Sequence, residues 1–192
     1  MSVPTPNKRF QLEKEVVEAI PDLWVIHAKV FPDERGFFSE SYNKVEWAEK
    51  IGFNENLVQD NHSFSKYGVT RGLHAQPYMG KLVTVVSGEI FDVAVDIRKG
   101  SPTFGKWHGV YLSGDNKDAF WLPPGFLHGF QVLSKEGAHV TYKCSAVYDP
   151  STEFGINPFD EEIGIKWPIT DKSAIIVSER DLKHPSFSLL EN

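Results

Sequence analysis

Two histidines are the residues of this chain best suited to move protons near neutral pH. His74 ends the segment RGLH at residues 71–74, and His128 ends the segment PGFLH at residues 124–128. Imidazole changes its charge between about pH 5 and 8, so histidine can act as a base or an acid under physiological conditions. Neither segment lies in sequence with a helical period, so both imidazoles are expected to project from a β-scaffold. This pattern indicates an enzyme.

The elements that would carry these histidines are predicted to be strands. Most segments alternate between apolar and polar residues, and glycine, proline, serine and aspartate interrupt them at short intervals. Residues 81–86 and 90–97 are predicted to form a hairpin around the turn SGE at residues 87–89. Its second arm divides into an apolar face with Phe91, Val93, Val95 and Ile97, and a polar face with Asp92, Ala94 and Asp96.

Residues 140–148 show the same alternation, which places Tyr142 and Tyr148 on one face, where both could point into one cavity. One early helix is predicted at residues 44–51, because Gly52 stands where helices commonly end. Many short strands with turns between them favour a closed sandwich or barrel. The predicted fold class is therefore mainly β, with a few short peripheral helices. Residues 1–18 are expected to form a flexible N-terminal segment.

Composition limits the class of protein. With 192 residues, 41% of them hydrophobic, the chain can bury roughly 70% of its unfolded surface in one core, so residues 1–192 are predicted to form a single domain. The net charge of −6 and the lack of a Lys/Arg run argue against nucleic acid or an anionic membrane as a partner. Cys144 is the only cysteine, which excludes an internal disulfide and favours a reducing compartment. No apolar run is long enough to cross a bilayer, so a cytoplasmic location is expected.

A series of motifs occurs in the order seen in one family of enzymes. The motifs are DERGFF at 33–38, QDNHS at 59–63, RGLH at 71–74, KLV at 81–83, DVAVDIR at 92–98, SPTFG at 101–105, PGFLHGF at 124–130 and SERD at 178–181. On these motifs the chain resembles the dTDP-4-dehydrorhamnose 3,5-epimerases, which are jelly-roll enzymes of the cupin superfamily. The resemblance implies a cupin-type jelly-roll barrel and a homodimer that needs no cofactor. It also implies inversion of C3 and C5 in a dTDP-linked 4-keto-6-deoxyhexose, usually for L-rhamnose synthesis.

The implied reaction requires three chemical roles. A 4-keto sugar has acidic C–H bonds at C3 and C5, so inversion needs a base on one face, a proton donor on the other and a positive group at the enolate oxygen. By matching position, His74 would be the base, and Asp181 would hydrogen-bond to it and stabilise its charged form, much as in a serine-protease triad. Tyr142 would donate a proton from the opposite face. Lys81 would place positive charge near the O4 anion.

The family match also implies which residues bind the substrate. Arg35 and Arg71 would contact the diphosphate, for which the planar guanidinium is well suited. Phe38 and Tyr148 would stack on the thymine. The sugar and base subsites would be lined by Glu40, Gln59, Asn61, His128 and Glu153. The segment 31–40 is predicted to be a strand that adds to a neighbour's sheet edge, so Arg35 would act in the partner's site.

Each of these assignments has a structural alternative: His74 could be a structural histidine, Tyr142 a core tyrosine, and Lys81 and Arg71 ordinary solvated charges. Asp181 lies three residues after a serine, which is the spacing of a helix capping box, and in that motif the aspartate bonds only to backbone. A strict strand over residues 69–76 would put Arg71 and His74 on opposite faces. A bulge at Gly72 could bring both onto one face. Asp92 and Asp96, in turn, could be ordinary polar residues of the barrel.

Two other functional classes compete with the epimerase. Metal cupins bind their metal through a His-x-His pair, a carboxylate and a later histidine, whereas this chain has His74-Ala75-Gln76, and an amide is a poor ligand for a transition metal. A metal-dependent cupin oxygenase or isomerase using His74, Gln76 and His128 is thus the weaker alternative, and no metal site is predicted. A sugar-binding jelly roll without catalysis would leave the base and the proton donor unexplained.

The chain departs from the family pattern at two places beside the expected site. Ala75 follows His74 where the family commonly has an aromatic residue, and the loop at residues 76–80 is shorter than usual. These differences leave open a 3- or 5-monoepimerase that acts on a related nucleotide sugar.

Overall fold

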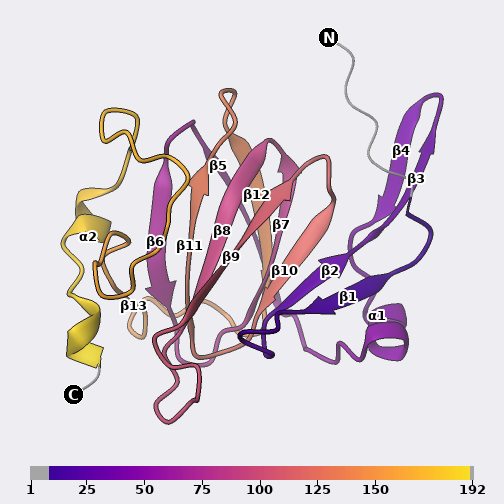
Figure 1. The fold of residues 1–192 in the computed structure, drawn as a ribbon. Helices are drawn as coiled ribbons and strands as arrows, with labels where there is room; N and C mark the ends of the chain where they lie inside the picture. Colours follow the sequence, from indigo (N-terminus) through magenta and orange to yellow (C-terminus); the bar gives the residue numbers. More distant parts are fainter. Residues whose placement is uncertain (1–8, 191–192) are drawn as a thin grey trace.

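Two antiparallel sheets face each other, and a two-stranded arm extends to one side of them (Figure 1). The computed structural model describes residues 9–190. One sheet has the strand order β1-β2-β10-β7-β12-β5, the other has the order β13-β6-β11-β8-β9, and the arm consists of β3 and β4. The strands are β1 (Glu13–Val16), β2 (Trp24–His27), β3 (Lys29–Asp33), β4 (Gly36–Glu40), β5 (Gln59–Ser65), β6 (Thr70–Ala75), β7 (Lys81–Ser87), β8 (Glu89–Asp96), β9 (Trp107–Ser113), β10 (Asp118–Leu122), β11 (Phe126–Val132), β12 (Ala138–Cys144) and β13 (Phe154–Gly155). The helices are α1 (Lys44–Ile51), α2 (Glu179–Leu182) and the 3-10 helix η1 (Phe187–Leu190).

Successive strands cross between the sheets. From β5 to β8, and again from β9 to β13, each strand lies in the sheet opposite to the one before it. This is the arrangement of a jelly roll, so the prediction of a mainly β fold is confirmed. The predicted hairpin at residues 81–97 is wrong, because β7 and β8 belong to different sheets. Gly88 turns the chain there with φ of 84°, and a local turn signal does not say which strands will pair.

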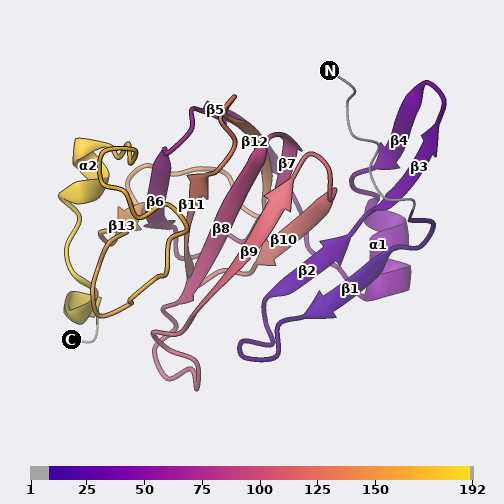
Figure 2. The ribbon, with the colours of Figure 1, turned by 45° about the horizontal axis from the view of Figure 1, so that its top comes forward.

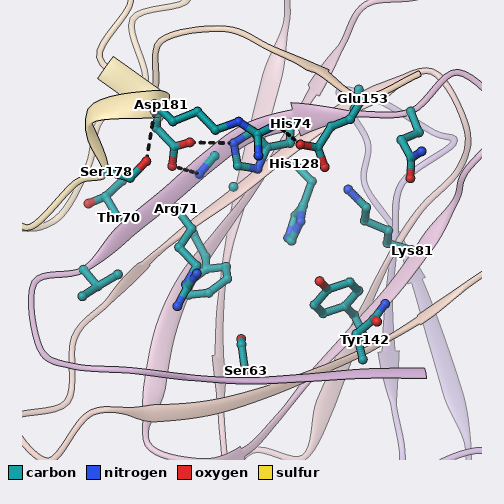
Figure 3. Close-up of a pocket in the computed structure, with 18 of the residues that line it drawn as sticks. Ser63, Thr70, Arg71, His74, Lys81, His128, Tyr142, Glu153, Ser178 and Asp181 are labelled. Carbon is teal, nitrogen blue, oxygen red and sulfur yellow. Dashed lines mark hydrogen bonds and ion pairs between the residues drawn. The ribbon is translucent and has the colours of Figure 1, made fainter. Parts of the chain in front are cut away.

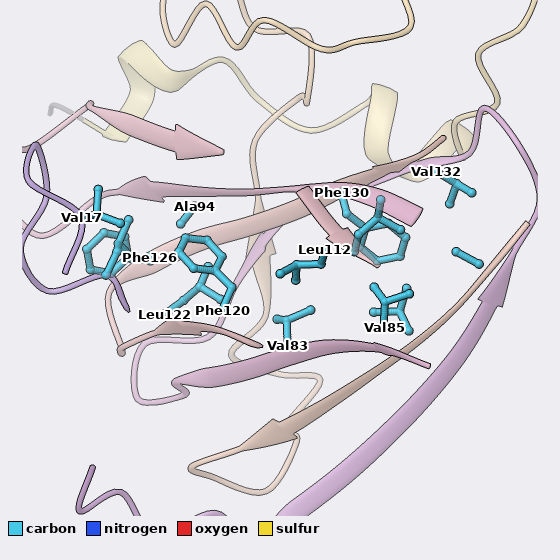
Figure 4. Close-up of a cluster of buried hydrophobic side chains, with 14 of the residues drawn as sticks. Val17, Val83, Val85, Ala94, Leu112, Phe120, Leu122, Phe126, Phe130 and Val132 are labelled. Carbon is cyan, nitrogen blue, oxygen red and sulfur yellow. The ribbon is translucent and has the colours of Figure 1, made fainter. Parts of the chain in front are cut away.

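Apolar side chains fill the space between the two sheets (Figure 4). Val83 and Val85 come from β7, Phe120 comes from β10, and Phe126 and Phe130 come from β11, and all five are buried. Burying one large apolar side chain contributes about 1.5–3 kcal/mol. This shared core holds the two sheets in a fixed relation.

The outer face of the five-stranded sheet is also covered. Phe91, Val93 and Val95 of β8 pack in a second cluster with Trp167 and Phe187 of the C-terminal segment. The predicted apolar face of this strand is therefore real. The predicted polar face is buried as well, with Ala94 in the core between the sheets and Asp92 and Asp96 fully buried.

The predicted helix is confirmed with its expected end. In α1, the Asn43 side chain accepts hydrogen bonds from the backbone N–H groups of Val45 and Glu46, and Gly52 closes the helix with φ of 72°. Trp47 and Ile51 pack this helix against the six-stranded sheet. None of the helices within residues 9–190 is long and apolar enough to span a membrane.

The N-terminal segment and the arm differ from the rest of the fold. Of the segment expected to be flexible, residues 1–8 lie outside the described residues, while β1 pairs with β2 at the sheet edge. The arm projects away from the sheets (Figure 2). Its aromatic side chains are exposed to solvent, with Phe31 at 37%, Phe37 at 42% and Phe38 at 66%. Apolar surface of this kind is typical of a contact region.

Candidate active site

A cavity of about 730 Å³ lies between the two sheets and receives side chains from both (Figure 3). Most of the residues singled out in the sequence line it. They are His74, Tyr142, Asp181, Lys81, Gln59, Asn61, Arg71, His128, Tyr148 and Glu153. Arg35, Phe38 and Glu40 are the exceptions, because they lie on the arm.

A bulge in β6 lets Arg71 and His74 reach the same cavity. His74 pairs with His128 of β11 and Arg71 pairs with Phe130, so three steps along β6 match two steps along β11. Gly72 occupies the bulge with φ of 112°, and a Cβ atom there would lie 2.6 Å from the Cα atom of Gly129. Glycine is therefore required by both conformation and space. The bulge considered at Gly72 in the sequence is confirmed.

His74 and Asp181 form a hydrogen-bonded pair. The Nε2 atom of His74 lies 2.8 Å from Oδ1 of Asp181, whose Oδ2 accepts a hydrogen bond from the backbone N–H of Gly72 at 3.3 Å. A carboxylate only accepts hydrogen bonds, so the pairing places the imidazole proton on Nε2 and leaves the lone pair of Nδ1 available. Burial lowers the pKa of His74, while the hydrogen bond to Asp181 opposes this effect. The neutral imidazole is the form that can remove a proton.

The helix-capping alternative for Asp181 is correct for its serine but not for its carboxylate. Ser178 is the N-cap of α2, and its hydroxyl accepts a hydrogen bond from the Asp181 N–H at 3.0 Å. The Asp181 carboxylate, however, points to His74 and Gly72 in the cavity wall. The short helix thus positions the carboxylate that orients the imidazole.

Tyr142 and Lys81 enter the cavity from the other sheet. Tyr142 lies on β12 and Lys81 lies at the start of β7, whereas His74 is on β6 of the five-stranded sheet. Burial raises the pKa of the Tyr142 phenol, so it stays protonated at neutral pH and can donate. Burial lowers the pKa of Lys81. No ion pair to the Lys81 ammonium occurs among residues 9–190, which leaves its charge free to face an anionic oxygen.

His128, which lines the cavity, forms a second histidine–aspartate pair. Its Nε2 atom lies 2.8 Å from Oδ1 of Asp92, and both side chains are buried. Burial raises the pKa of Asp92, and the nearby His128 and Lys81 lower it. Asp96 is elsewhere, bound by Arg98 in the loop after β8, and these hydrogen bonds hold its pKa at about 2 despite burial. Of the two aspartates, only Asp92 is hydrogen-bonded to a side chain that lines the cavity.

Polar side chains on the cavity wall hold one another in place. Gln59 donates to Asn61 at 3.0 Å and accepts from the backbone N–H of Tyr148 at 2.8 Å. Arg71 donates through Nε to Ser65 at 2.9 Å, which fixes the orientation of its guanidinium group. These bonds pre-orient the groups that would contact a polar ligand.

Two residues near the site were not identified from the sequence. Arg180 lines the cavity and forms an ion pair with Glu153, and its signal was its place in the SERD motif beside Asp181. The Nε2 atom of His184 lies 3.9 Å from Oδ1 of Asp181. No sequence pattern marked His184, because it joins the site only through the turn after α2.

The arm residues lie outside this cavity. Arg35 is an exposed side chain in the arm's turn and pairs with Asp33 at 2.6 Å. Phe38 stacks on Phe31 with ring centroids 6.3 Å apart, and Glu40 lies 3.6 Å from the ammonium group of Lys29. Within one chain, the arm therefore contributes nothing to the cavity.

The metal-cupin alternative lacks the geometry that it requires. The amide of Gln76 donates to the carbonyl of Asp149 at 2.5 Å and to the Thr152 hydroxyl at 2.9 Å, so it is engaged in the loop beside the cavity. In the described part of the chain, the group of His, Cys, Asp and Glu side chains close enough to share a metal is His74, Asp181 and His184. This group does not contain His128.

Comparison with known proteins identifies the family. The family model for dTDP-4-dehydrorhamnose 3,5-epimerase matches residues 18–188, which is most of the chain. The chain belongs to the dTDP-4-dehydrorhamnose 3,5-epimerase family. The family resemblance and the jelly-roll fold expected from the sequence are therefore confirmed.

Individual members of the epimerase family are similar over nearly their full length. The dTDP-4-dehydrorhamnose 3,5-epimerase of Shigella flexneri is 52% identical over 171 residues, which cover 88% of this chain and 92% of that protein. The solved 3,5-epimerase of Legionella pneumophila, in complex with dTDP-4-keto-L-rhamnose, is 46% identical with a TM-score of 0.87, covering 93% of this chain and 94% of that one. ChmJ, a 3'-monoepimerase from Streptomyces bikiniensis solved with dTDP-quinovose, is 31% identical with a TM-score of 0.83, covering 92% and 88%.

Proposed function

We propose that this chain converts dTDP-4-dehydro-6-deoxy-D-glucose to dTDP-4-dehydro-L-rhamnose by inverting C3 and C5. The observation that carries the proposal is the opposed pair of His74 and Tyr142, which face one cavity from two different sheets. Inversion requires removal of a proton from one face of a carbon and its return from the other. Family membership supports the choice of substrate, since the similar proteins are dTDP-4-dehydrorhamnose 3,5-epimerases.

In the proposed mechanism, Nδ1 of His74 removes the proton from the carbon next to the C4 ketone. The C–H electron pair moves into the C3–C4 or C4–C5 bond, and the negative charge moves to O4. Lys81 stabilises this enolate oxygen, while Asp181 stabilises the imidazolium. Tyr142 then donates its phenolic proton to the same carbon from the opposite face. The imidazolium then loses its proton to solvent and the phenolate regains one from solvent, after which the same groups act on the second carbon.

The proposed binding subsites follow from the positions of the polar groups. Arg71 binds the diphosphate, since a guanidinium fixed by Ser65 is well suited to phosphate oxygens. Tyr148, which is partly exposed at the cavity, stacks on the thymine. The sugar and base subsites are lined by Gln59, Asn61, His128 and Glu153, which surround the cavity.

The arm completes the site in a homodimer. Arg35, Phe38 and Glu40 cannot reach the cavity of their own chain, and the arm presents exposed aromatic side chains. We propose that the arm adds to a second copy, so that Arg35 contacts the diphosphate and Phe38 the thymine in the partner's site. The active enzyme would then need two chains for each complete site.

One experiment distinguishes the proposed function from its alternatives. The protein is incubated in deuterated water with dTDP-4-keto-6-deoxyglucose, and the sugar is followed by NMR. The expected result is solvent deuterium at both C3 and C5 with formation of the inverted product. Exchange and inversion at one carbon alone would identify a monoepimerase, for which ChmJ is the similar protein. Binding without any exchange would identify a sugar-binding module and refute the proposal.

A further inference from the structure

A third side chain stands beside the pair of His74 and Asp181. The His184 imidazole packs edge-on against that of His74, with ring centroids 5.4 Å apart and an interplanar angle of 75°. Its Nε2 atom lies 3.9 Å from Oδ1 of Asp181 and is buried without a hydrogen-bond partner in the described structure. A buried polar atom without a partner is costly, so this nitrogen is poised for a ligand.

The fold makes room for this imidazole. β13 pairs with β6 so that Gly155 is opposite His74. A Cβ atom at position 155 would lie 2.6 Å from Nε2 of His184 and 2.7 Å from the carbonyl oxygen of Leu73. Any larger residue at this position would therefore push His184 away from Asp181. Gly155 permits two imidazoles to share the surroundings of one carboxylate.

We propose that His74, Asp181 and His184 bind a zinc ion, and that the bound ion inhibits the enzyme. Two imidazoles and a carboxylate with a free fourth position form a ligand set that suits Zn²⁺. The ligand atoms lie within 4.8 Å of one another. Bonds of 2.0–2.2 Å separate the donors around zinc by roughly 3 to 4 Å, so shifts of about 1 Å or less close the site.

The inhibition follows from which nitrogen of the His74 ring bears the proton. Zinc bound at Nε2 of His74 displaces the hydrogen bond to Asp181, and the single proton of the neutral ring then resides on Nδ1. A protonated Nδ1 cannot accept a proton from the sugar. This consequence rests on the proposed role of His74 as the base, whereas the binding of zinc does not.

The test measures binding and activity separately on the full-length protein after removal of metals with a chelator. Zn²⁺ is titrated by calorimetry, and Co²⁺ is used as a spectroscopic probe of imidazole ligation. The expected result is one zinc ion bound per chain. The zinc affinity of His184→Asn should be at least about tenfold weaker, because loss of a residue that merely supports a metal ligand already weakens binding about tenfold or more, and loss of the ligand itself should cost no less. Zinc should inhibit the wild type reversibly, and inhibition of each variant is compared with its own metal-free rate.

The control variant is His62→Asn. His62 and His139 form an exposed imidazole pair with nitrogens 2.9 Å apart, which is a second place where zinc could bind. This variant should retain the inhibition. Absence of binding in the wild type, or equal zinc affinity and inhibition in His184→Asn, would overturn the proposal. Should His184→Asn fail to fold by circular dichroism, His184→Gln serves in its place. Zinc binding that depends on His184 but causes no inhibition would support the metal site and count against His74 as the base.

Discussion

Asp181 holds His74 through one carboxylate oxygen, at 2.8 Å, and holds the backbone N–H of Gly72 through the other, at 3.3 Å. The carboxylate is thus fixed between the imidazole and the bulge that places the imidazole. The two residues of the pair are 107 positions apart in the sequence. A carboxylate held at both oxygens can orient the ring and stabilise its charged form without moving during the reaction.

Loss of the base and loss of its partner should have different effects. His74→Ala should incorporate no deuterium at C3 or C5, a loss of at least about a hundredfold, because no other group replaces the general base. Asp181→Asn should be slow but active, since the imidazole remains while its orientation and charge stabilisation are impaired. The measurement is deuterium washin by NMR under single-turnover conditions. Washin at the wild-type rate in His74→Ala would show that another residue is the base.

Replacement of the proton donor should uncouple exchange from inversion. Tyr142→Phe removes the phenol hydroxyl and leaves the ring in the cavity wall. His74 can still remove a proton and return deuterium to the original face, so exchange should continue with little inverted product. The ratio of exchanged substrate to product, read from the same NMR spectra, checks this outcome. A variant that loses exchange and inversion equally would contradict the assignment of Tyr142 as the donor.

The acid limb of the pH profile of kcat/KM should lie at lower pH than an ordinary histidine would give. Burial lowers the pKa of His74 below its ordinary value of 6.5, with Asp181 opposing the shift. The base must be neutral, so kcat/KM should fall only as the pH drops through a value below 6.5. In Asp181→Asn the opposing interaction is weakened, and the limb should move to lower pH still. The profiles of both proteins from about pH 4.5 to 8 test this, and a limb that moves upward would contradict it.

Mixed subunits should reveal whether the arm acts in the partner's site. Arg35→Ala and His74→Ala are each expected to be impaired, and after subunit exchange a hybrid dimer contains one site with both residues intact. Random exchange at equal amounts makes half of the dimers hybrids, so about a quarter of the sites should be active. The matched control mixes His74→Ala with Tyr142→Phe. Both residues line the cavity of the same chain, so each site of this hybrid lacks one of them and inversion should not recover. No recovery with Arg35→Ala after verified exchange would show that each chain has a self-contained site.

Local signals in the sequence were sufficient for some elements and not for others. The helix α1 was predicted with its end, because Gly52 adopts the left-handed conformation that such a glycine favours. The hairpin at residues 81–97 was not correctly predicted. The turn at Gly88 and the two strands beside it do form, but strand pairing is set by the packing of the two sheets. Alternation likewise could not show that the C-terminal segment covers the outer face of β8.

The site residues could be predicted from the sequence where they belong to a family motif or match the family by position. The family motifs contain His74, Lys81 and Asp181, and matching by position added Tyr142; the fold brings all four to one cavity. The bulge that places His74 beside Arg71 could only be considered as an option, since register depends on the opposite strand. His184 had no signal, because its contact with Asp181 depends on a turn and on the absence of a side chain at position 155.

His74 and Tyr142, the proposed base and proton donor, lie on opposite sheets, so the apolar core between the sheets would affect the stereochemistry of the reaction. Val83, Phe126 and Phe130 help to fill the layer between these sheets, and Tyr142 packs against the same cluster. Facing sheets pack about 10 Å apart, and that spacing changes with the volume of the side chains between them. A smaller core residue would bring the two groups closer or let them drift, even though it touches no substrate. The fidelity of the proposed inversion would therefore depend on the close packing of the barrel interior as well as on the polar groups of the cavity.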